Sequence, residues 1–565
     1  MIICGIKITH DGAIALIDNG KLIFSYEMEK IDNNHRHKEF CLSMPEIEKI
    51  FNTYGYSVSQ IDKWVLDGWR GEKHGDPCVF KGLNFLNGNQ TVDLELAKYG
   101  HLIKDDVVSL EPKSFTLPQI NMSYDSYLHV TSHILAAYCS SPFAEKKEDS
   151  FVLIWDGGMP PQLFYYKYEN NEIISLGPLM YMFGSIYVDF PHEFEPYCNY
   201  EKHMSIAGKL MAYIALGETE ESIVTAYGKI YDGIMEGVDE DKITPLDILD
   251  FTAKFVELSK AFAVKEGTRD KDMLTSLHSF LEQFLIENLE KCIGENPEFT
   301  KNLCFSGGSA LNIKWNSAIR ASKVVDEMWI PPFPNDSGNA IGVACCAMVY
   351  YDNIKALDWN VYTGPSFKLS SVAESKYTTK SCSLEELATI IHETNEPILF
   401  LNGRAELGPR ALGNRSILSA PTSHDMKSLL NEIKIREGYR PIAPICLEED
   451  APKVFNPGTP DPYMLFQHIV RDEWRNKVPA VVHLDGSSRL QTVNKNENKE
   501  IHELLSHYKK LSGVPLLCNT SANLKGVGFF PDLKTAIDWG RINYIWSDGV
   551  LYSSKSVEAE TTQTK

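Results

Sequence analysis

The sequence predicts an α/β protein with at least two domains, and three observations support this. A chain of 565 residues is too long for one hydrophobic core. Its composition, 43% apolar and 23% charged, is typical of a globular protein. Strand-like runs alternate with helical stretches through the first half of the chain. We therefore expect helices packed on sheets in more than one folding unit.

A unit of three strands occurs twice in the first half. The runs "MIICGIKI", "AIALI" and "KLIFSYEME" are separated by the turn sequences "HDG" and "DNG". A similar order begins at Phe151, where an apolar strand leads into Asp156, Gly157 and Gly158, and two further strands follow around the Asn170-Asn171 turn. The spacing predicts a structural repeat.

Helical periodicity and a change of composition suggest the domain boundaries. The stretch "YLHVTSHILAAYCSSPF" and the region 245–292 have apolar residues spaced near 3.6. Residues 359–383 are polar, and a helix over 384–393 and the strand "PILFLNG" follow. We predict a first domain over 1–358, a linker over 359–383, a second domain over 384–552 and a disordered tail over 553–565.

The charge and the cysteines exclude several classes of protein. A net charge of -21 argues against a broad surface for nucleic acid or anionic membrane. No basic segment precedes a long apolar run, and no stretch of about 20 apolar residues occurs. The 12 cysteines include no CxxC pair, as in proteins of a reducing compartment. We expect a cytoplasmic protein without nucleic-acid or membrane partners.

The sequence "HVTSH" predicts part of a metal site. On a helix, His129 and His133 project from one face about one turn apart, as two metal-ligating histidines require. Such pairs also occur by chance on exposed helices. Asp156 and Asp336 lie at element boundaries beside glycines and could complete a mixed nitrogen and oxygen site. The residues leave iron, zinc and manganese open.

Glycine-rich segments are a less specific signal of a phosphate site. In "CFSGGSALNIKWN" a strand runs into Gly307 and Gly308 before a helix, so backbone N–H groups could face a phosphate; a turn without ligand is the alternative. The chain lacks a GxGxxG fingerprint. The spacing from Gly403 to Gly408 continues with Pro409 and Arg410 instead of Lys and Ser/Thr, which argues against a Walker-type ATPase.

Basic residues gather in Gly- and Pro-rich segments of the second half. The stretch "GRAELGPRALGNRS" contains Arg404, Arg410 and Arg415, and "IKIREGYRPIAP", "HLDGSSRLQTV" and "CNTSANLKG" follow. Arginine presents a planar fork of donors that matches phosphate and carboxylate oxygens. For any one arginine a solvated surface position is the simpler interpretation, but the group predicts an anion pocket.

The order and spacing of these motifs resemble the NodU/CmcH family of O-carbamoyltransferases. The resemblance covers nearly the whole chain, through "THDGAIALIDNG", the HxxxH helix, "WDGG", "AGKLMAY", "FSGGSALN", "NDSGNAIG", "GRAELGPRALGNRS" and "NTSAN". It implies an actin-like (ASKHA) first domain similar to the tRNA threonylcarbamoyl-transferase subunit and a YrdC-like α/β second domain. The chain departs from many relatives at "EMEKIDNNHRHKEF", which leaves the roles of His37 and Lys38 open.

The resemblance also implies a reaction in two steps. The second domain would make carbamoyl adenylate from carbamoyl phosphate and ATP, and Mg²⁺ would assist. The first domain would transfer the carbamoyl group to a hydroxyl of a small-molecule acceptor, such as an antibiotic or another natural product. A divalent transition metal, for which the resemblance favours Fe²⁺, would lie in the first domain.

The resemblance assigns residues to each step. His10 in "THDG" would be the base for the acceptor, although a turn histidine is the alternative. The metal ligands would be His129, His133, Asp156 and Asp336. Nucleotide and carbamoyl phosphate would bind Arg410, Lys434, Arg436, Arg440, Arg489, Ser521 and Asn523. In the first domain the nucleotide would contact Gly157, Lys209, Gly307, Gly308 and Asn312.

Two other classes of function stay open. An actin-like small-molecule kinase would use the glycine loops but would not need a second basic domain. A nucleotide- and metal-binding protein without catalysis would need no acceptor. The identity of the acceptor, the roles of Arg404 and Arg415, and the oligomeric state, with a homodimer as one alternative, are not determined by the sequence.

Overall fold

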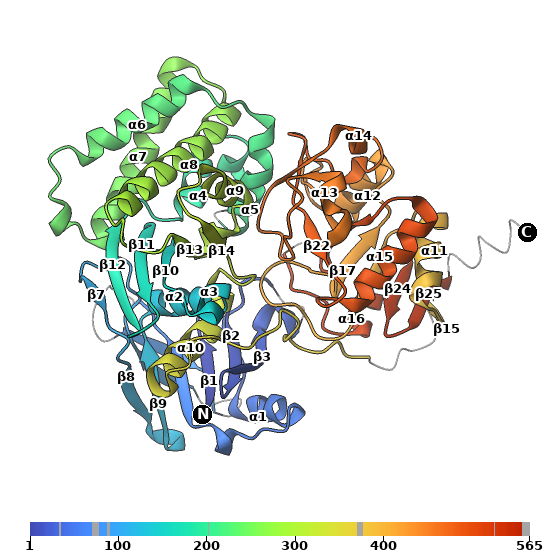
Figure 1. Ribbon diagram of the computed structural model, residues 1–565, viewed down its shortest axis with the longest axis horizontal. Helices are drawn as coiled ribbons and strands as arrows, with labels where there is room; N and C mark the ends of the chain where they lie inside the picture. Colours follow the sequence, from blue (N-terminus) through green and yellow to red (C-terminus); the bar gives the residue numbers. More distant parts are fainter. Residues whose placement is uncertain are drawn as a thin grey trace, which may run out of the picture. The chain divides into compact units, whose positions relative to one another are not determined.

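The computed structural model describes residues 1–32, 35–70, 78–86, 91–201, 203–369, 377–524 and 526–555 (Figure 1). Two compact units make up the chain. The first contains Met1–Ile23 and Glu39–Trp359, and the second contains Phe24–Lys38 and Asn360–Lys565. Within the described ranges, no helix is both long and apolar enough to cross a membrane.

The two units differ from the predicted domains in two respects. Phe24–Lys38, which the sequence assigned to the first domain, belongs to the second unit. The strand β3 (Lys21–Glu27) passes from one unit into the other. Part of the predicted linker is a strand, β15 (Tyr377–Ser381), which pairs with β25 (Val550–Ser554). Residues 370–376 of that linker, and 556–565 of the predicted tail, lie outside the described residues.

The first unit contains two six-stranded sheets with the same core topology. In each sheet three antiparallel strands that follow one another in the sequence lie side by side. Two further strands lie next to the first of the three and run parallel to it, and the first sheet has one more, antiparallel strand at that edge. The first sheet has the order β3, β2 (Ala13–Asp18), β1 (Ile2–Lys7), β4 (Lys63–Asp67), β9 (Met122–Tyr127) and β8 (Lys113–Leu117). The second has the order β12 (Glu172–Pro178), β11 (Gln162–Lys167), β10 (Ser150–Ile154), β13 (Asn302–Ser306) and β14 (Glu327–Trp329), with β7 (Val107–Val108) beyond β12.

This duplication confirms the predicted repeat and is the actin-like arrangement. Two helices connect the sheets, since α10 (Asn339–Asp352) packs on β1, β2 and β4, and α2 (His129–Cys139) packs on β10 and β13 and on α10. Glycine permits α10 to lie close to β1 and to α2. A Cβ at Gly5 would lie 2.0 Å from the carbonyl oxygen of Ala340, and one at Gly342 would lie 2.0 Å from that of Ser132.

A group of helices follows the second sheet's first hairpins in the sequence. Figure 1 shows α6 (Glu221–Met235), α7 (Pro245–Glu266) and α8 (Asp270–Gly294) gathered at one end of this unit. The predicted helical region 245–292 is therefore two helices. The break is at Gly267, whose φ of 68° ends α7 in the left-handed conformation that glycine adopts without strain.

The second unit is built on an eight-stranded mixed sheet. Its order is β15, β25, β24 (Tyr544–Ser547), β16 (Ile398–Leu401), β17 (Arg415–Ser419), β23 (Leu516–Ser521), β18 (Ala443–Leu447) and β22 (Gln491–Val493). Helix α11 (Leu384–Thr394) packs on α15 (Lys499–Ser512). The predicted helix near Leu384 and the strand "PILFLNG" are confirmed.

Candidate functional site

The structure brings the four predicted metal ligands together in the first unit. His129 and His133 are on α2, Asp156 follows β10, and Asp336 begins the 3-10 helix η9 (Asp336–Gly338). One ligand atom of each residue lies within 4.8 Å of the others, and all four residues are buried. Helix α2, the end of β10 and the start of η9 thus bring two imidazoles and two carboxylates close together.

The Nε2 atoms of both imidazoles face Asp336 Oδ1, at 3.6 Å for His129 and 3.4 Å for His133. His129 Nδ1 lies 2.7 Å from Asp67 Oδ2, and His133 Nδ1 lies 3.4 Å from Ser306 Oγ. The Nε2 atoms of both rings are buried without a hydrogen-bond partner among the described residues. Burial lowers the pKa of His129, which favours the neutral imidazole that binds metal, whereas the carboxylates of Asp336 and Asp156 outweigh burial and raise the pKa of His133. The donor set therefore fits a divalent transition metal.

Three residues that were not predicted surround these ligands. Lys7, at the end of β1, has its Nζ 3.1 Å from Asp67 Oδ2 and 2.9 Å from Asp336 Oδ2. The Tyr99 ring stacks on His129 at 4.1 Å, and its hydroxyl donates to Asp156 Oδ2 at 3.3 Å. A signal existed for Asp67, because the order apolar strand, Asp, Gly occurs at both Asp67 and Asp156.

His10 lies beside the cluster and is partly open to solvent. Its Nε2 is 3.6 Å from Asp336 Oδ2, and its Nδ1 is 3.6 Å from Asp11 Oδ2, with 34% of the side chain exposed. Burial opposes the charged form, but the carboxylates of Asp336 and Asp11 raise the pKa of His10 above its ordinary value. The ring also meets the Trp69 indole edge-to-face at 6.2 Å.

The residues predicted for nucleotide in this unit make several internal contacts. The Gly308 N–H donates to Asp156 Oδ1 at 2.6 Å, and the Asn312 side chain caps α9 (Ile313–Ser322). Gly307 has a φ of 91°, and open space surrounds the Cα of Gly157. Lys209, on α5 (Ser205–Tyr213), has its Nζ 4.5 Å from the centre of the Tyr200 ring.

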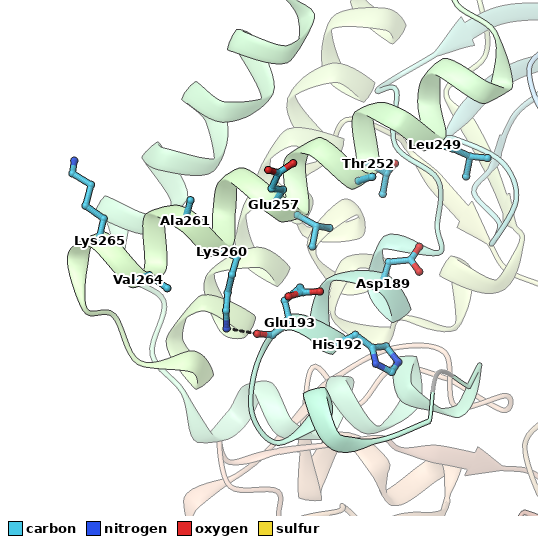
Figure 2. Close-up of a pocket in the computed structure, with 12 residues that line it drawn as sticks. Asp189, His192, Glu193, Leu249, Thr252, Glu257, Lys260, Ala261, Val264 and Lys265 are labelled. Carbon is cyan, nitrogen blue, oxygen red and sulfur yellow. Dashed lines mark hydrogen bonds between the residues drawn. The ribbon is translucent and has the colours of Figure 1, made fainter.

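A groove of about 880 Å³ runs along α7 in the same unit (Figure 2). The opposite wall is formed by α4 (Ile186–Asp189) and the 3-10 helix η4 (Phe190–Glu193). The Lys260 ammonium donates to the Glu193 carbonyl, and Leu249 and Val264 supply apolar surface. None of the predicted site residues lines this groove.

The second unit contains the predicted cluster of cations. Burial, followed by the nearby guanidinium groups of Arg489, Arg36 and Arg440, lowers the pKa of Arg410 well below its ordinary range. Burial and Arg440 also lower the pKa of Arg489 to about 10, and burial with Arg440 and Arg489 lowers that of Arg436 to about 9. Cations that destabilise one another in this way favour a bound anion.

Arg36 was not predicted, although it belongs to this cluster. Its Nε lies 3.3 Å from Glu29 Oε2, and its backbone N–H donates to the Gly526 carbonyl at 3.2 Å. It also contributes to the lowered pKa of Lys434. The neighbouring Lys38, whose role was left open, forms an ion pair with Asp32.

Lys434, Ser521 and Asn523, which the resemblance assigns to nucleotide and carbamoyl phosphate, contact one another. The Lys434 ammonium donates to the Ser521 carbonyl at 2.6 Å and to both oxygens of Asn523, while Ser521 Oγ donates to Asn523 Oδ1 at 2.6 Å. Arg436 Nε donates to Asn431 Oδ1 at 2.6 Å. These hydrogen bonds hold the loop after β23 and the turn after α12 (His424–Ile433) in defined conformations.

The other two arginines of "GRAELGPRALGNRS" brace backbone. Arg415 donates to the carbonyls of Asn402 at 2.7 Å, Asn414 at 2.9 Å, and Pro365 and Gly403 at 3.1 Å. Arg404 donates to the carbonyls of Gly364 and Thr363. Within the same loop, the Glu406 carboxylate accepts from the backbone N–H groups of Leu412, Asn414 and Arg415. Arg410 extends from a loop that its neighbours hold in place.

We expect Arg415→Met to lower the free energy of unfolding by about 3 kcal/mol, because carbonyls that now accept from a cation would lose their donor. Urea denaturation followed by circular dichroism measures this loss. Arg410→Met should not lower the urea midpoint. A stable Arg415→Met variant that had lost enzymatic activity would instead make Arg415 a ligand-binding residue.

Comparison with protein families defines the class of protein. Residues 2–345 match the family model described as the carbamoyltransferase N-terminus, and residues 389–545 match the one described as the carbamoyltransferase C-terminus. The chain belongs to the carbamoyltransferase family, so the resemblance that the motifs carried is confirmed. The protein is an enzyme of the transferase class.

Individual relatives share the whole length of the chain. It is 45% identical to "Nodulation protein U" of Rhizobium tropici, over 99% of this chain and 97% of that protein. It is 30% identical to the "3'-hydroxymethylcephem-O-carbamoyltransferase" of Streptomyces clavuligerus, over 96% and 97% respectively. Among solved structures, the activator of the 2-hydroxyisocaproyl-CoA dehydratase from Clostridium difficile is 13% identical, with a TM-score of 0.32 over 62% of this chain and 96% of that one.

Proposed function

We propose that the protein is an ATP-dependent O-carbamoyltransferase that works through carbamoyl adenylate. The observation that carries this proposal is the cluster of Arg410, Arg436, Arg440 and Arg489 in the second unit. Burial, followed by the neighbouring guanidinium groups, lowers the pKa of Arg410, Arg436 and Arg489, and a bound polyanion would compensate these charges. Membership of the carbamoyltransferase family gives the group that is transferred. The name of the cephem relative supports a hydroxyl acceptor.

The first step would take place at this basic cluster. Carbamoyl phosphate and ATP bring several negative charges together, so Arg410, Arg436, Arg440 and Arg489 would neutralise the repulsion between them, with Mg²⁺. One water would be consumed as the bond between the carbamoyl group and the phosphate breaks, which gives carbamate and releases phosphate. A carbamate oxygen would then attack the α-phosphorus of ATP as the bond to pyrophosphate breaks. Lys434 would position Ser521 and Asn523 against the nucleotide or the carbamoyl group.

The second step would take place in the first unit. His129, His133, Asp156 and Asp336 would hold one divalent metal, and we propose Fe²⁺. When bound, such an ion is a Lewis acid that stabilises negative charge on a phosphate leaving group. Gly157, Lys209, Gly307, Gly308 and Asn312 stay our proposed contacts for the nucleotide, supported by the open space at Gly157.

His10 would act on the acceptor. A hydroxyl is a poor nucleophile at neutral pH, and a base must take its proton as the oxygen attacks the carbamoyl carbon. The bond from that carbon to the AMP oxygen then breaks, and AMP leaves. His10 is a partly exposed imidazole beside the proposed metal cluster.

The acceptor would be a small molecule of natural-product type. All 12 cysteines are free thiols, which supports a cytoplasmic reaction.

Release of pyrophosphate from ATP tests the proposal. It should require carbamoyl phosphate, and phosphate should appear in equal amount. A small-molecule kinase would instead form ADP without carbamoyl phosphate, and a binding protein without catalysis would form neither product. Either result would overturn the proposed function.

We expect His10→Asn to lower carbamoylation of the acceptor by about 100-fold or more, because the asparagine side chain cannot take the hydroxyl proton. Formation of pyrophosphate should continue at the wild-type rate. Quantifying both products in one reaction separates the two steps. Loss of both steps would show that His10 is not the base for the acceptor.

A further inference from the structure

Lys7 contacts Asp336 of the proposed metal cluster but is not one of its ligands. We infer that Lys7 is an internal cation that keeps the metal site formed while it is empty, and that its charge makes metal binding weaker than the ligands alone would allow. This inference rests on the proposed metal site. It predicts that removing the Lys7 charge tightens metal binding, whereas removing a residue that only helps to hold a ligand would weaken it.

One ammonium group holds two of the ligands. Lys7 Nζ lies 2.9 Å from Asp336 Oδ2, while Asp336 Oδ1 faces His133 Nε2 at 3.4 Å and His129 Nε2 at 3.6 Å. Lys7 Nζ also lies 3.1 Å from Asp67 Oδ2, the same oxygen that is 2.7 Å from His129 Nδ1. Lys7 therefore holds Asp336 directly and His129 through Asp67.

Burial makes this charge necessary when no metal is bound. The side chains of Lys7, Asp67, His129 and Asp336 are each at most 3% exposed. Asp156 is also buried nearby, so three carboxylates share a region that solvent screens poorly. Two carboxylates that flank one ammonium would repel each other if that ammonium were removed, and an uncompensated buried charge is strongly destabilising.

A bound divalent cation would reduce the contribution of Lys7 to stability. The metal itself would neutralise the carboxylates, and Lys7, which contacts the second oxygen of a ligand, would repel it. The contribution of Lys7 to stability is thus largest in the empty protein. Because stability and binding are linked, a change that destabilises the empty form more than the loaded form must tighten metal binding.

The test is Lys7→Met in the full chain, with methionine replacing the stem but not the charge. Metal is removed with a chelator and Fe²⁺ is added without oxygen. Thermal unfolding is followed for both forms, and the Fe²⁺ dissociation constant is measured by competition with a chromophoric chelator. We expect the gap in Tm between loaded and empty protein to widen by about 5 °C or more. The dissociation constant should fall by about tenfold or more.

Two further variants isolate the charge. Lys63→Met removes a less buried lysine of the same unit, whose Nζ is 3.2 Å from Asp125 Oδ2, and should lower Tm equally in both forms. In Lys7→Met with Asp67→Asn, one carboxylate leaves with the cation, so the empty protein should regain most of its lost stability.

The outcomes are distinct. A Lys7→Met protein that folds only with Fe²⁺ would support the inference. Weaker Fe²⁺ binding, equal losses of Tm in both forms, or failure to fold even with Fe²⁺ would overturn it. If the wild-type protein bound no Fe²⁺, the proposed metal site would fall as well, whereas the pyrophosphate assay would still report on the second unit.

Discussion

Arg410→Met is expected to lower pyrophosphate release from ATP and carbamoyl phosphate by about 10³-fold. The arginine fork would no longer neutralise charge as the two anions approach, and arginines that act on phosphoryl groups contribute effects of this size. The pKa of Arg410 is lowered by burial and by Arg489, Arg36 and Arg440. Removing one cation therefore relieves repulsion, and the variant should be at least as stable as the wild type.

Two matched variants identify the cause of that loss. Arg410→Lys keeps the charge without the fork, and its rate should lie between those of the wild type and Arg410→Met. Arg471→Met removes a half-exposed arginine of the same unit, whose Nε donates to the Pro452 carbonyl, and should have the wild-type rate. A fully active Arg410→Met enzyme would show that the anions bind elsewhere.

The second large effect is expected for His133→Ala. The variant should purify with less than about one tenth of the wild-type metal content, because loss of one of four ligands weakens a mixed nitrogen and oxygen site strongly. Carbamoylation of the acceptor should fall by about 100-fold or more. Pyrophosphate release should be unchanged, since the arginine cluster belongs to the other compact unit.

Elemental analysis by mass spectrometry and the two product assays measure these effects. His133 is the better choice for this test, because His129 is also tied to Asp67 and Lys7 and its removal would disturb several contacts. Equal loss of both reaction steps would contradict separate sites for them. Full metal content in the variant would remove His133 from the ligand set.

The repeat, and the grouping of the four proposed metal ligands, could be predicted because their signals are local. Apolar strands followed by Asp and Gly mark the ends of β4 and β10, and the i, i+4 spacing places His129 and His133 on one helical face. Such patterns depend on backbone geometry, which the nearest neighbours in the chain largely determine. The ligands then converge because parallel strands and helix starts meet at one edge of the folded unit.

The three arginines of one short loop could not be told apart in this way. Arg404 and Arg415 bind carbonyl groups that lie close to them only in the folded chain, whereas Arg410 joins Arg36, Arg440 and Arg489. Each pairing depends on segments that are far apart in the sequence. Residue type alone predicted an anion pocket and the resemblance named Arg410 for it, but neither could tell what Arg404 and Arg415 contact.

The sequence by itself thus determined the α/β class, the repeated three-strand unit, the membership of the family and the residue types of both sites. Only the tertiary structure decided that Phe24–Lys38 joins the second unit, that Lys7 and Asp67 contact the proposed metal ligands, and that Arg404 and Arg415 brace backbone. The physical reason is that periodicity reflects local backbone geometry. Ion pairs and buried hydrogen bonds depend instead on which distant segments the fold brings within about 3 Å of one another.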